Sequence, residues 1–290
     1  MNDQIGIFSG ITFEEYVKID ALNGSSLVNL RRSPMYYRHC LDNPQPPTPA
    51  MILGTATHRL ILEPERVGDF AVWGEISEHR TAGGNMRPRN GKDWDAFKAA
   101  NADKMIVTAD QRDEMVGMAV GARKNVPIMK YANAKGQTEV SMVWRDKQNG
   151  RLWKGRIDKL LLNHTICDLK TTRDCHRRKF ETQSYALGYH IKMSIYWSGY
   201  LTLTGHMAHP KLLAIDSKAP YESAVYRVTS DVLLQGADER DELLATLDKC
   251  EETNTWPAEL DEETDLMLPT WLGAGEQDSL EEFAEPEVEA

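Results

Sequence analysis

Two aspartates and one lysine stand out in the stretch GRIDKLLLNHTICDLKTT, residues 155–172, which otherwise has the composition of buried β-strands. Because side chains alternate between the two faces of a strand, Asp168 and Lys170 share one face. Asp158 belongs to the preceding strand, across a tight turn, so its carboxylate can lie close to that of Asp168. Three apolar neighbours are expected to anchor the opposite face in the core: Ile157, Cys167 and Leu169.

This pattern is typical of a metal site. Two neighbouring carboxylates repel each other, and burying both charges is costly unless a cation lies between them. Carboxylate oxygens with open water positions suit Mg²⁺ or Mn²⁺. Lys170 could then orient or deprotonate an attacking water, or stabilise a phosphorane-like charge. The alternative is a structural ion pair of Asp168 with Lys170, which is weakly stabilising at best and leaves Asp158 over.

Alternating and turn-forming residues predict the strands that carry these groups. Residues 138–146 and 151–162 read as a hairpin around Asn149-Gly150, a strong turn signal. A second tight turn at Asn163-His164 leads into a third strand. Downstream we expect a helical stretch with a break near Gly188, two further strands and an amphipathic helix, at residues 175–203, 211–217, 222–230 and 231–250.

The N-terminal part reads as mainly helical. Residues 22–42 predict two short helices, the second with Ser33 as N-cap and Pro34 in the first turn. A proline-rich connector, residues 43–50, precedes the helix MILGTATHRLILEPERV, which carries His58. Residues 78–95 predict a mobile basic loop, and residues 110–126 another helix. The order of helices, meander, helix and strands indicates an α/β sandwich.

Charge is distributed unevenly along the 290-residue chain. Its net charge is −10, yet residues 251–290 hold 14 Asp and Glu and no Lys or Arg. Residues 145–192 hold 12 Lys and Arg against 5 Asp and Glu, which favours an anionic ligand; a merely solvated charged face is the alternative. We expect one domain over residues 1–270, helical to about 130 with a catalytic core at about 131–250, and a disordered acidic tail at 271–290.

Several classes of protein are excluded by composition. No apolar run reaches the roughly 18–20 residues of a membrane helix, and MNDQIGIFSG lacks the features of a secretory signal, so we expect a cytoplasmic protein without membrane contact. The four cysteines are too scattered for a disulfide framework or an iron–sulfur cluster. No phosphate-binding loop of the G-x-x-x-x-G-K-[ST] type is present, so the activity should not need ATP.

The spacing of Asp158, nine residues and then Asp168-Leu169-Lys170 resembles the core of PD-(D/E)XK nucleases. The words KGRIDKL, CDLKTT and GTATH resemble the RecB-like branch of that superfamily. Within it, LNGSSLVNLRRSPMYYRH and YHIKMSIYWSGY make the chain most similar to the RecE-type exonuclease VIII of prophages. The resemblance covers roughly residues 20–250 and implies a mixed central β-sheet flanked by helices, after an N-terminal helical part.

The resemblance also implies roles for individual residues. Asp158 and Asp168 would be metal ligands, His58 a further ligand, and the backbone carbonyl of Leu169 would complete the shell around Mg²⁺ or Mn²⁺. Lys170 would be the catalytic lysine. Glu139, at the start of the first strand of the meander, could be another ligand, directly or through water; an edge-strand surface glutamate is the alternative.

Other residues are candidates for binding DNA. Lys192 and Tyr196 match a helical Gln-x-x-x-Tyr motif in spacing, but lysine replaces glutamine, so Lys192 could bind phosphate instead. A basic cluster after the third strand could contact the DNA backbone, or be only a solvated helix start. The DNA-binding or supporting candidates are Lys192, Tyr196, Thr171, Thr172, Arg173, Arg177, Arg178, Lys179 and Arg156. Aromatic residues of the following helix, Tyr189 among them, could stack on bases but are more typical of a core.

By resemblance, we expect a metal-dependent exonuclease that degrades linear double-stranded DNA from the 5′ strand and leaves 3′ single-stranded tails for recombination. The expected partners are duplex DNA ends, a RecT-type single-strand annealing protein, and further copies of the chain in a ring, a trimer or a tetramer. The alternatives are a structure-specific or single-strand endonuclease of the same fold, a non-catalytic DNA-end-binding module, and an acidic-tailed DNA mimic.

Overall fold

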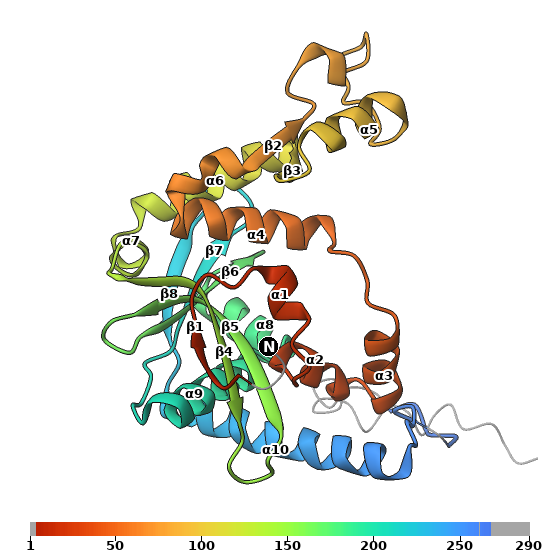
Figure 1. Ribbon diagram of the computed structural model, residues 1–290, viewed down its shortest axis with the longest axis vertical. Coiled ribbons are helices and arrows are strands. Elements are labelled where there is room, and N and C mark those ends of the chain that lie inside the picture. Colours follow the sequence, from red (N-terminus) through yellow and green to blue (C-terminus); the bar gives the residue numbers. More distant parts are fainter. Residues whose placement is uncertain (1–3, 261, 268–290) are drawn as a thin grey trace, which may run out of the picture.

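A six-stranded β-sheet forms the centre of the computed structural model, which describes residues 4–260 and 262–267. Its strands follow the order β1-β4-β5-β6-β7-β8; β6 and β7 run parallel and the other neighbours antiparallel. The predicted mixed sheet flanked by helices is confirmed (Figure 1). The strands are β1 (Gly6–Phe8), β4 (Gly136–Arg145), β5 (Leu152–Leu161), β6 (Ile166–Thr172), β7 (Lys211–Asp216) and β8 (Ser223–Arg227).

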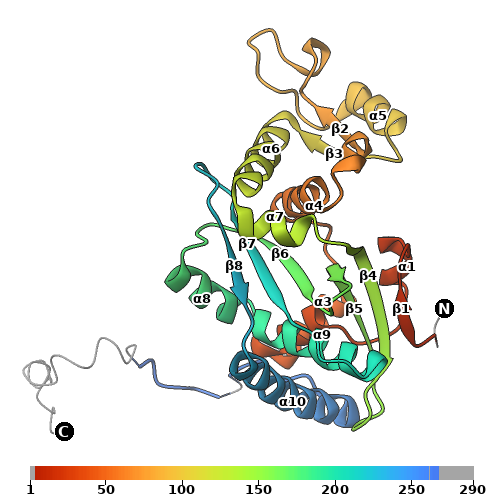
Figure 2. The same cartoon turned by 90° about the vertical axis from the view of Figure 1, so that its left-hand side faces the viewer.

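Helices cover both faces of this sheet (Figure 2). On one face α9 (Tyr189–Thr204) packs on β4 and β5, and α10 (Ser230–Thr253) packs against the outside of α9. On the other face α4 (Pro49–Leu62) and α6 (Ala109–Lys124) pack against each other and on β5, β6 and β7, with α7 (Val126–Ala132) beside them. The central strands are therefore shielded from water on both sides.

The elements predicted for the core are present close to their expected bounds. The hairpin of β4 and β5 turns through Gly150, whose φ of 71° lies in the left-handed region that glycine tolerates. The predicted break in the helical stretch separates α8 (Arg177–Ala186) from α9 at Gly188, with φ 64°. The predictions of β6, β7, β8, α6 and α10 are likewise confirmed.

Side chains along β5 do not keep the strict alternation that the sequence predicted. Ile157 packs in the cluster under α9, whereas Leu161, four residues later, packs on the side of α4 and α6. A regular strand would place both on one face, so the alternation shifts by one residue between them, in the stretch that holds Asp158. Cys167 and Leu169 also pack on the side of α4 and α6. The prediction that Ile157 shares their face is therefore wrong.

The helices before the connector begin as their sequence predicts. Ser33 is the N-cap of α3 (Pro34–Asp42), and its side chain accepts a hydrogen bond of 3.0 Å from the backbone N–H of Tyr36. The first predicted helix is split into α2 (Gly24–Leu27) and the 3₁₀ turn η1 (Val28–Arg31).

A buried lysine ties the N-terminal segment to the sheet. Lys154 of β5 is 6% exposed, and its ammonium donates to the carbonyl oxygens of Tyr16, Val17 and Ile19 at 3.2, 3.0 and 2.7 Å. These carbonyls lie at the C-terminal end of α1 (Phe13–Val17), where unpaired carbonyl groups need partners. Neither α1 nor β1 was predicted from the sequence.

A smaller unit projects from the main body beyond α6 (Figure 1). It pairs β2 (Phe70–Trp73) in parallel with β3 (Met105–Thr108). The remaining elements of this unit are η2 (Pro64–Asp69), η3 (Ser77–His79) and α5 (Gly91–Ala100).

Residues 78–95 were predicted as a loop without regular structure, and this is wrong in part. The helix α5 begins at Gly91, and His79 is buried against Trp73 with 4.1 Å between ring centroids. Phe97 packs edge-on against the same His79 ring at 4.9 Å. The apolar partners lie outside the stretch, so its own composition could not show that it folds.

Within residues 4–260 and 262–267, no helix is both long and apolar enough to cross a membrane. The predicted disordered tail, residues 271–290, lies outside the part of the chain that the structure describes. The division of residues 1–270 into a helical part and a catalytic core stays a prediction.

We predict that Lys154→Met lowers the free energy of unfolding by about 2–4 kcal/mol, because three carbonyl groups lose a charged donor. Urea denaturation followed by circular dichroism measures this. Lys147→Met, in the exposed turn of the hairpin, is the control and should change stability by less than about 0.5 kcal/mol. Equal effects of the two substitutions would show that Lys154 does not hold the N-terminal segment.

Candidate active site

The carboxylate of Asp158 is fixed by its neighbours on two other elements. Its Oδ2 accepts a hydrogen bond of 2.7 Å from the backbone N–H of Leu169 on β6 and lies 3.4 Å from Nδ1 of His58 on α4. Burial alone would raise the pKa of Asp158, but His58 and Lys170 together hold that pKa below its ordinary value. Burial likewise opposes the charged form of His58, yet Asp158 raises the pKa of the imidazole. The structure thus joins α4, β5 and β6 at one point.

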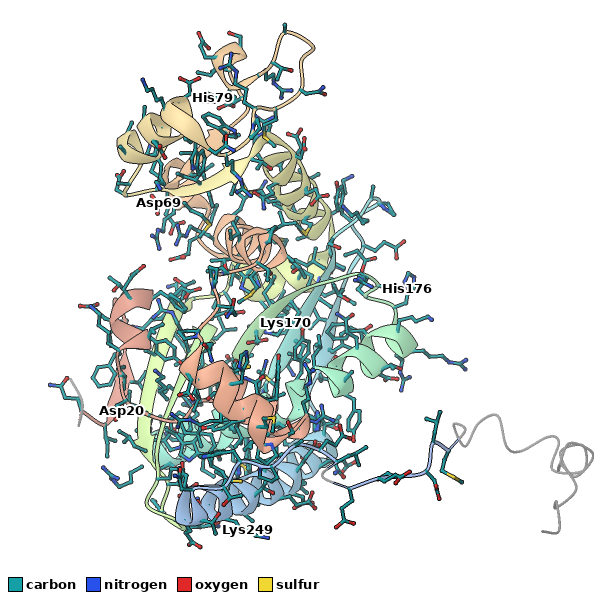
Figure 3. The ribbon with its side chains drawn as sticks, turned by 90° about the vertical axis from the view of Figure 1, so that its right-hand side faces the viewer. Asp20, Asp69, His79, Lys170, His176 and Lys249 are labelled. Atoms are coloured by element: carbon teal, nitrogen blue, oxygen red, sulfur yellow. The ribbon has the colours of Figure 1, made fainter. Side chains whose placement is uncertain are left out.

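Asp168 faces Lys170 on the same strand, near the middle of the molecule (Figure 3). The Asp168 side chain is 5% exposed and its Oδ2 contacts the Lys170 ammonium, but it accepts no hydrogen bond of ordinary geometry. Burial raises the pKa of Asp168, and the charge of Asp158 raises it further. Burial lowers the pKa of Lys170, but Asp168 and Asp158 outweigh it and raise that pKa overall. Asp168 therefore has a buried oxygen that only a cation satisfies.

These residues fit a divalent ion. Asp158, Asp168 and the Leu169 carbonyl offer hard oxygen donors, His58 offers a nitrogen, and the underpartnered Oδ2 of Asp168 is available to a cation. The ligand atoms of His58, Asp158 and Asp168 do not all lie within 4.8 Å of one another in the described structure. The Lys170 ammonium stands against Asp168 instead, so binding an ion requires small movements of these side chains.

Tyr189 and Lys192, from the first turns of α9, lie beside this group. The ammonium groups of Lys170 and Lys192 stand 5.1 and 5.7 Å from the centroid of the Tyr189 ring. Burial and the charge of Lys170 lower the pKa of Lys192 to about 8. Tyr189 was considered from the sequence only as a base-stacking or core residue. Its position three residues before Lys192, on one helical face, was the signal that placed it here.

Tyr196, also on α9, reaches the same place from deeper in the core. Burial and the charges of Asp168 and Asp158 raise its pKa well above its ordinary value. A Cβ atom added at Gly155 would come within 2.8 Å of the Tyr196 ring, so only glycine at this point of β5 leaves room for the ring. The structure therefore brings Lys192 and Tyr196 to the carboxylates, as the motif spacing predicted.

Glu139 and Arg156 pair with each other. Nε of Arg156 donates to Oε2 of Glu139 at 2.7 Å, and Nη1 donates to Oγ of Ser141 and the carbonyl of Ile11 at 2.9 and 3.0 Å. Glu139 has a φ of 53°, in the left-handed region that costs a non-glycine residue energy, and lies opposite Asp158 in the β4–β5 register. In this arrangement Glu139 is held by Arg156 and does not face His58.

The strand that carries Asp168 ends at a pocket of about 460 Å³. Thr171, Thr172 and Arg173 line it together with residues of α4, α6 and α8, and Oγ1 of Thr172 donates to Gln183 at 2.5 Å. Lys218, which the sequence did not suggest, adds a second cation to its wall. The predicted group Thr171–Arg173 is thus partly exposed next to the carboxylates.

The remaining basic candidates lie further out. Arg177, Arg178 and Lys179 are exposed at the start of α8. Arg177 is engaged by Glu181 at 2.8 Å, one turn later. No side-chain ion pair joins Arg178 or Lys179 to an acidic residue within the described residues. These two therefore remain open to a ligand.

Comparison with known proteins identifies the class of this fold. Residues 24–267 match the family described as "PDDEXK-like domain of unknown function (DUF3799)". No curated protein matches the sequence. Because the family covers most of the chain, the protein belongs to this PDDEXK-like family, and its fold is that of the PD-(D/E)XK superfamily.

Solved structures agree with that fold. A protein from Eubacterium rectale described as a "putative exonuclease" is 14% identical, with a TM-score of 0.61 over 92% of this chain and 100% of its own. An alkaline exonuclease from Laribacter hongkongensis is 13% identical, with a TM-score of 0.29 over 69% of this chain and 95% of its own. At such identities the first shows a shared fold, and the second is too dissimilar to support an argument.

We predict that Gly155→Ala lowers the free energy of unfolding by about 1–3 kcal/mol, because the new methyl group displaces the Tyr196 ring. Thermal or urea unfolding measures the change. Gly68→Ala is the matched control, since a Cβ at Gly68 meets nothing within 4 Å. Should Gly155→Ala be as stable as the control, Tyr196 would not occupy the place described here.

Proposed function

We propose that the protein is a metal-dependent nuclease, and specifically an exonuclease that degrades linear double-stranded DNA to leave 3′ single-stranded tails. The observation that carries the proposal is the meeting of Asp158, Asp168 and Lys170 in the sheet with His58 from α4, inside a PDDEXK-like fold. Two buried carboxylates without enough positive charge between them are a poor structural device and a good ion site.

Under this proposal Asp158, Asp168, His58 and the Leu169 carbonyl hold one Mg²⁺ or Mn²⁺. Such an ion, when bound, lowers the pKa of water and offsets charge on the phosphate. Lys170 donates hydrogen bonds from its ammonium to the attacking water or to a phosphate oxygen. The Leu169 N–H and His58 keep Asp158 oriented throughout.

The surroundings of the site suit a polyanion. Lys192 and Lys170 present two ammonium groups on either side of the Tyr189 ring, and Arg173 and Lys218 line the adjacent pocket. Lysine and arginine contacts to phosphate dominate the affinity of proteins for DNA. This arrangement supports DNA over an uncharged substrate.

The finer parts of the proposal rest on the resemblance to RecE-type exonucleases in the motifs of the sequence. They are digestion of the 5′ strand, assembly into a ring of three or four copies, cooperation with a RecT-type annealing protein, and action in the cytoplasm. Light scattering of the purified chain measures the proposed assembly, and a monomer would refute the ring.

We predict that the protein with Mg²⁺ digests an end-labelled linear duplex and leaves a closed circle of the same sequence intact. Release of the 5′ label first, as mononucleotide, is expected for attack on the 5′ strand. Cuts inside the circle would favour the endonuclease alternative. Binding of ends without any cleavage would favour the DNA-end-binding module.

Lys170→Met should reduce the rate of this digestion by roughly 10²–10³-fold, since it removes a donor that acts on developing charge. Lys124→Met, at the exposed end of α6, is the control and should digest at the wild-type rate. Full activity of Lys170→Met would refute its assignment to the reaction.

Lys192→Gln, which restores the family motif, should weaken binding of duplex DNA measured without divalent ions. If Lys192 contacts one phosphate, the slope of log affinity against log salt should fall by about 0.9. Lys98→Gln, exposed on α5, serves as the matched substitution and should leave the slope unchanged. An unaltered slope for Lys192→Gln would show that Lys192 does not bind phosphate.

A further inference from the structure

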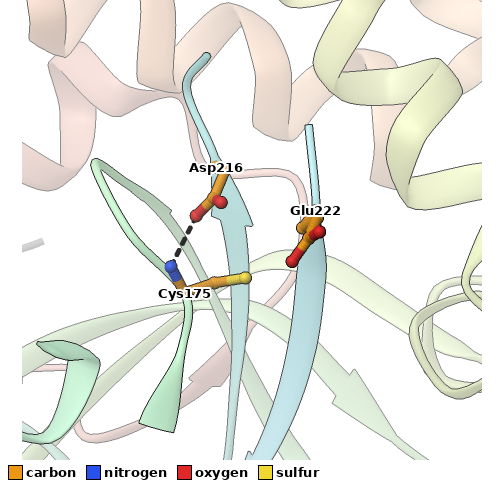
Figure 4. A group of neighbouring side chains, drawn as sticks. All are labelled: Cys175, Asp216 and Glu222. Atoms are coloured by element: carbon orange, nitrogen blue, oxygen red, sulfur yellow. Dashed lines mark hydrogen bonds between the residues drawn. The ribbon is translucent and has the colours of Figure 1, made fainter. Parts of the chain in front are cut away.

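A buried cysteine lies between two carboxylates at the end of β7, apart from the carboxylates of the proposed active site. One ligand atom each of Cys175, Asp216 and Glu222 lies within 4.8 Å of the others (Figure 4). Among the residues that the structure describes, no other group of three His, Cys, Asp or Glu residues meets this distance. The three come from the β6–α8 connection, the end of β7 and the residue before β8.

The inner half of this cluster is shielded from water. Cys175 is 4% exposed and Asp216 is 9% exposed, and the thiol points into the space between the two carboxylates (Figure 4). The Cys175 N–H donates to Oδ1 of Asp216 at 2.5 Å, but the thiol itself makes no contact of hydrogen-bond geometry in the described structure. A buried thiol without a partner, aimed between two acidic groups, is costly unless a cation joins them.

An imidazole stands at the open side of the cluster. Nε2 of His176 is 3.2 Å from Oε2 of Glu222, and Nδ1 of His176 is 2.8 Å from Oδ1 of Asp174. A carboxylate on the far nitrogen of a histidine is the usual way in which proteins orient a metal-binding imidazole. Both His176 and Glu222 are exposed, which leaves an ion a route from solvent.

We propose that Cys175, Asp216 and Glu222, with His176 as fourth ligand, form a structural site for one zinc-class divalent ion. Sulfur and nitrogen donors beside carboxylates suit Zn²⁺ in four-coordinate geometry, whereas Mg²⁺ prefers oxygen donors alone. Four protein ligands leave no open position, so the site is structural and not catalytic. Binding displaces the thiol proton to solvent, because the thiolate is the ligand.

The position of the site indicates what the ion stabilises. The backbone N–H of Ser217 donates to the carbonyl of Thr172 at 2.8 Å, and the hydroxyl of Tyr226 donates to the carbonyl of Cys175. The ion would fasten the connection after β6 to the β7–β8 turn beside these contacts. It would thereby fix the backbone that carries Thr172 and Arg173 at the rim of the pocket, whether or not the protein cleaves DNA.

Titration of the metal-free full-length protein with Co²⁺, followed by absorption, tests the site. A thiolate ligand gives a charge-transfer band in the near ultraviolet, which carboxylate and imidazole ligands do not. We expect this band at one equivalent of Co²⁺ in the wild type and in Cys250→Ser, and its loss in Cys175→Ser. Cys250 is the matched control because it is also 4% exposed, on α10. No band in the wild type, or the same band in Cys175→Ser, would overturn the proposal.

A second pair of variants guards against misfolding of Cys175→Ser. Glu222→Gln changes a surface carboxylate and should weaken Co²⁺ binding by roughly tenfold or more. Glu181→Gln is its control, because the two side chains are 53% and 55% exposed. Equal Co²⁺ affinity in both variants, or an equal rise in melting temperature with Zn²⁺, would exclude Glu222 and contradict the site. Neither readout depends on cleavage of DNA, so this proposal can fail independently of the nuclease proposal.

Discussion

The burial of two neighbouring carboxylates, Asp158 and Asp168, is the constraint on which the rest of the structure depends. Each raises the cost of charge on the other, and neither can reach bulk water. The protein offsets this with three groups from different elements: the Leu169 N–H, the His58 imidazole and the Lys170 ammonium. Positive charge is still insufficient at Oδ2 of Asp168, which is the physical reason to infer a bound cation.

The fold is arranged to hold these groups rigidly. The parallel pair β6–β7 lies in the middle of the sheet, so the strand of Asp168 is braced on both edges. Helix α4 lies over one face and supplies His58, and α9 lies over the other and supplies Tyr189, Lys192 and Tyr196. Close approach is secured by a glycine at position 155, where a larger residue would displace the Tyr196 ring.

Local sequence signals predicted much of this arrangement. Asn149-Gly150 predicted the hairpin, and the spacing of Asp158, Asp168 and Lys170 predicted their proximity, because both depend on residues close in the chain. The interpretation failed where distant contacts decide. A three-residue strand such as β1 has no periodicity to detect, and the shift of faces after Ile157 depends on how β4 and β5 pack against different helices. Cys175 meets Asp216 only through folding, since they are 41 residues apart.

The central claim is that the buried carboxylates bind a divalent ion, and calorimetric titration with Mn²⁺ tests it most directly. The account predicts that Asp168→Asn binds Mn²⁺ at least about tenfold more weakly than the wild type, because a charged ligand is lost. Asp103→Asn, at an exposed position, should bind Mn²⁺ as the wild type does. The same Mn²⁺ affinity in Asp168→Asn as in the wild type would contradict the account.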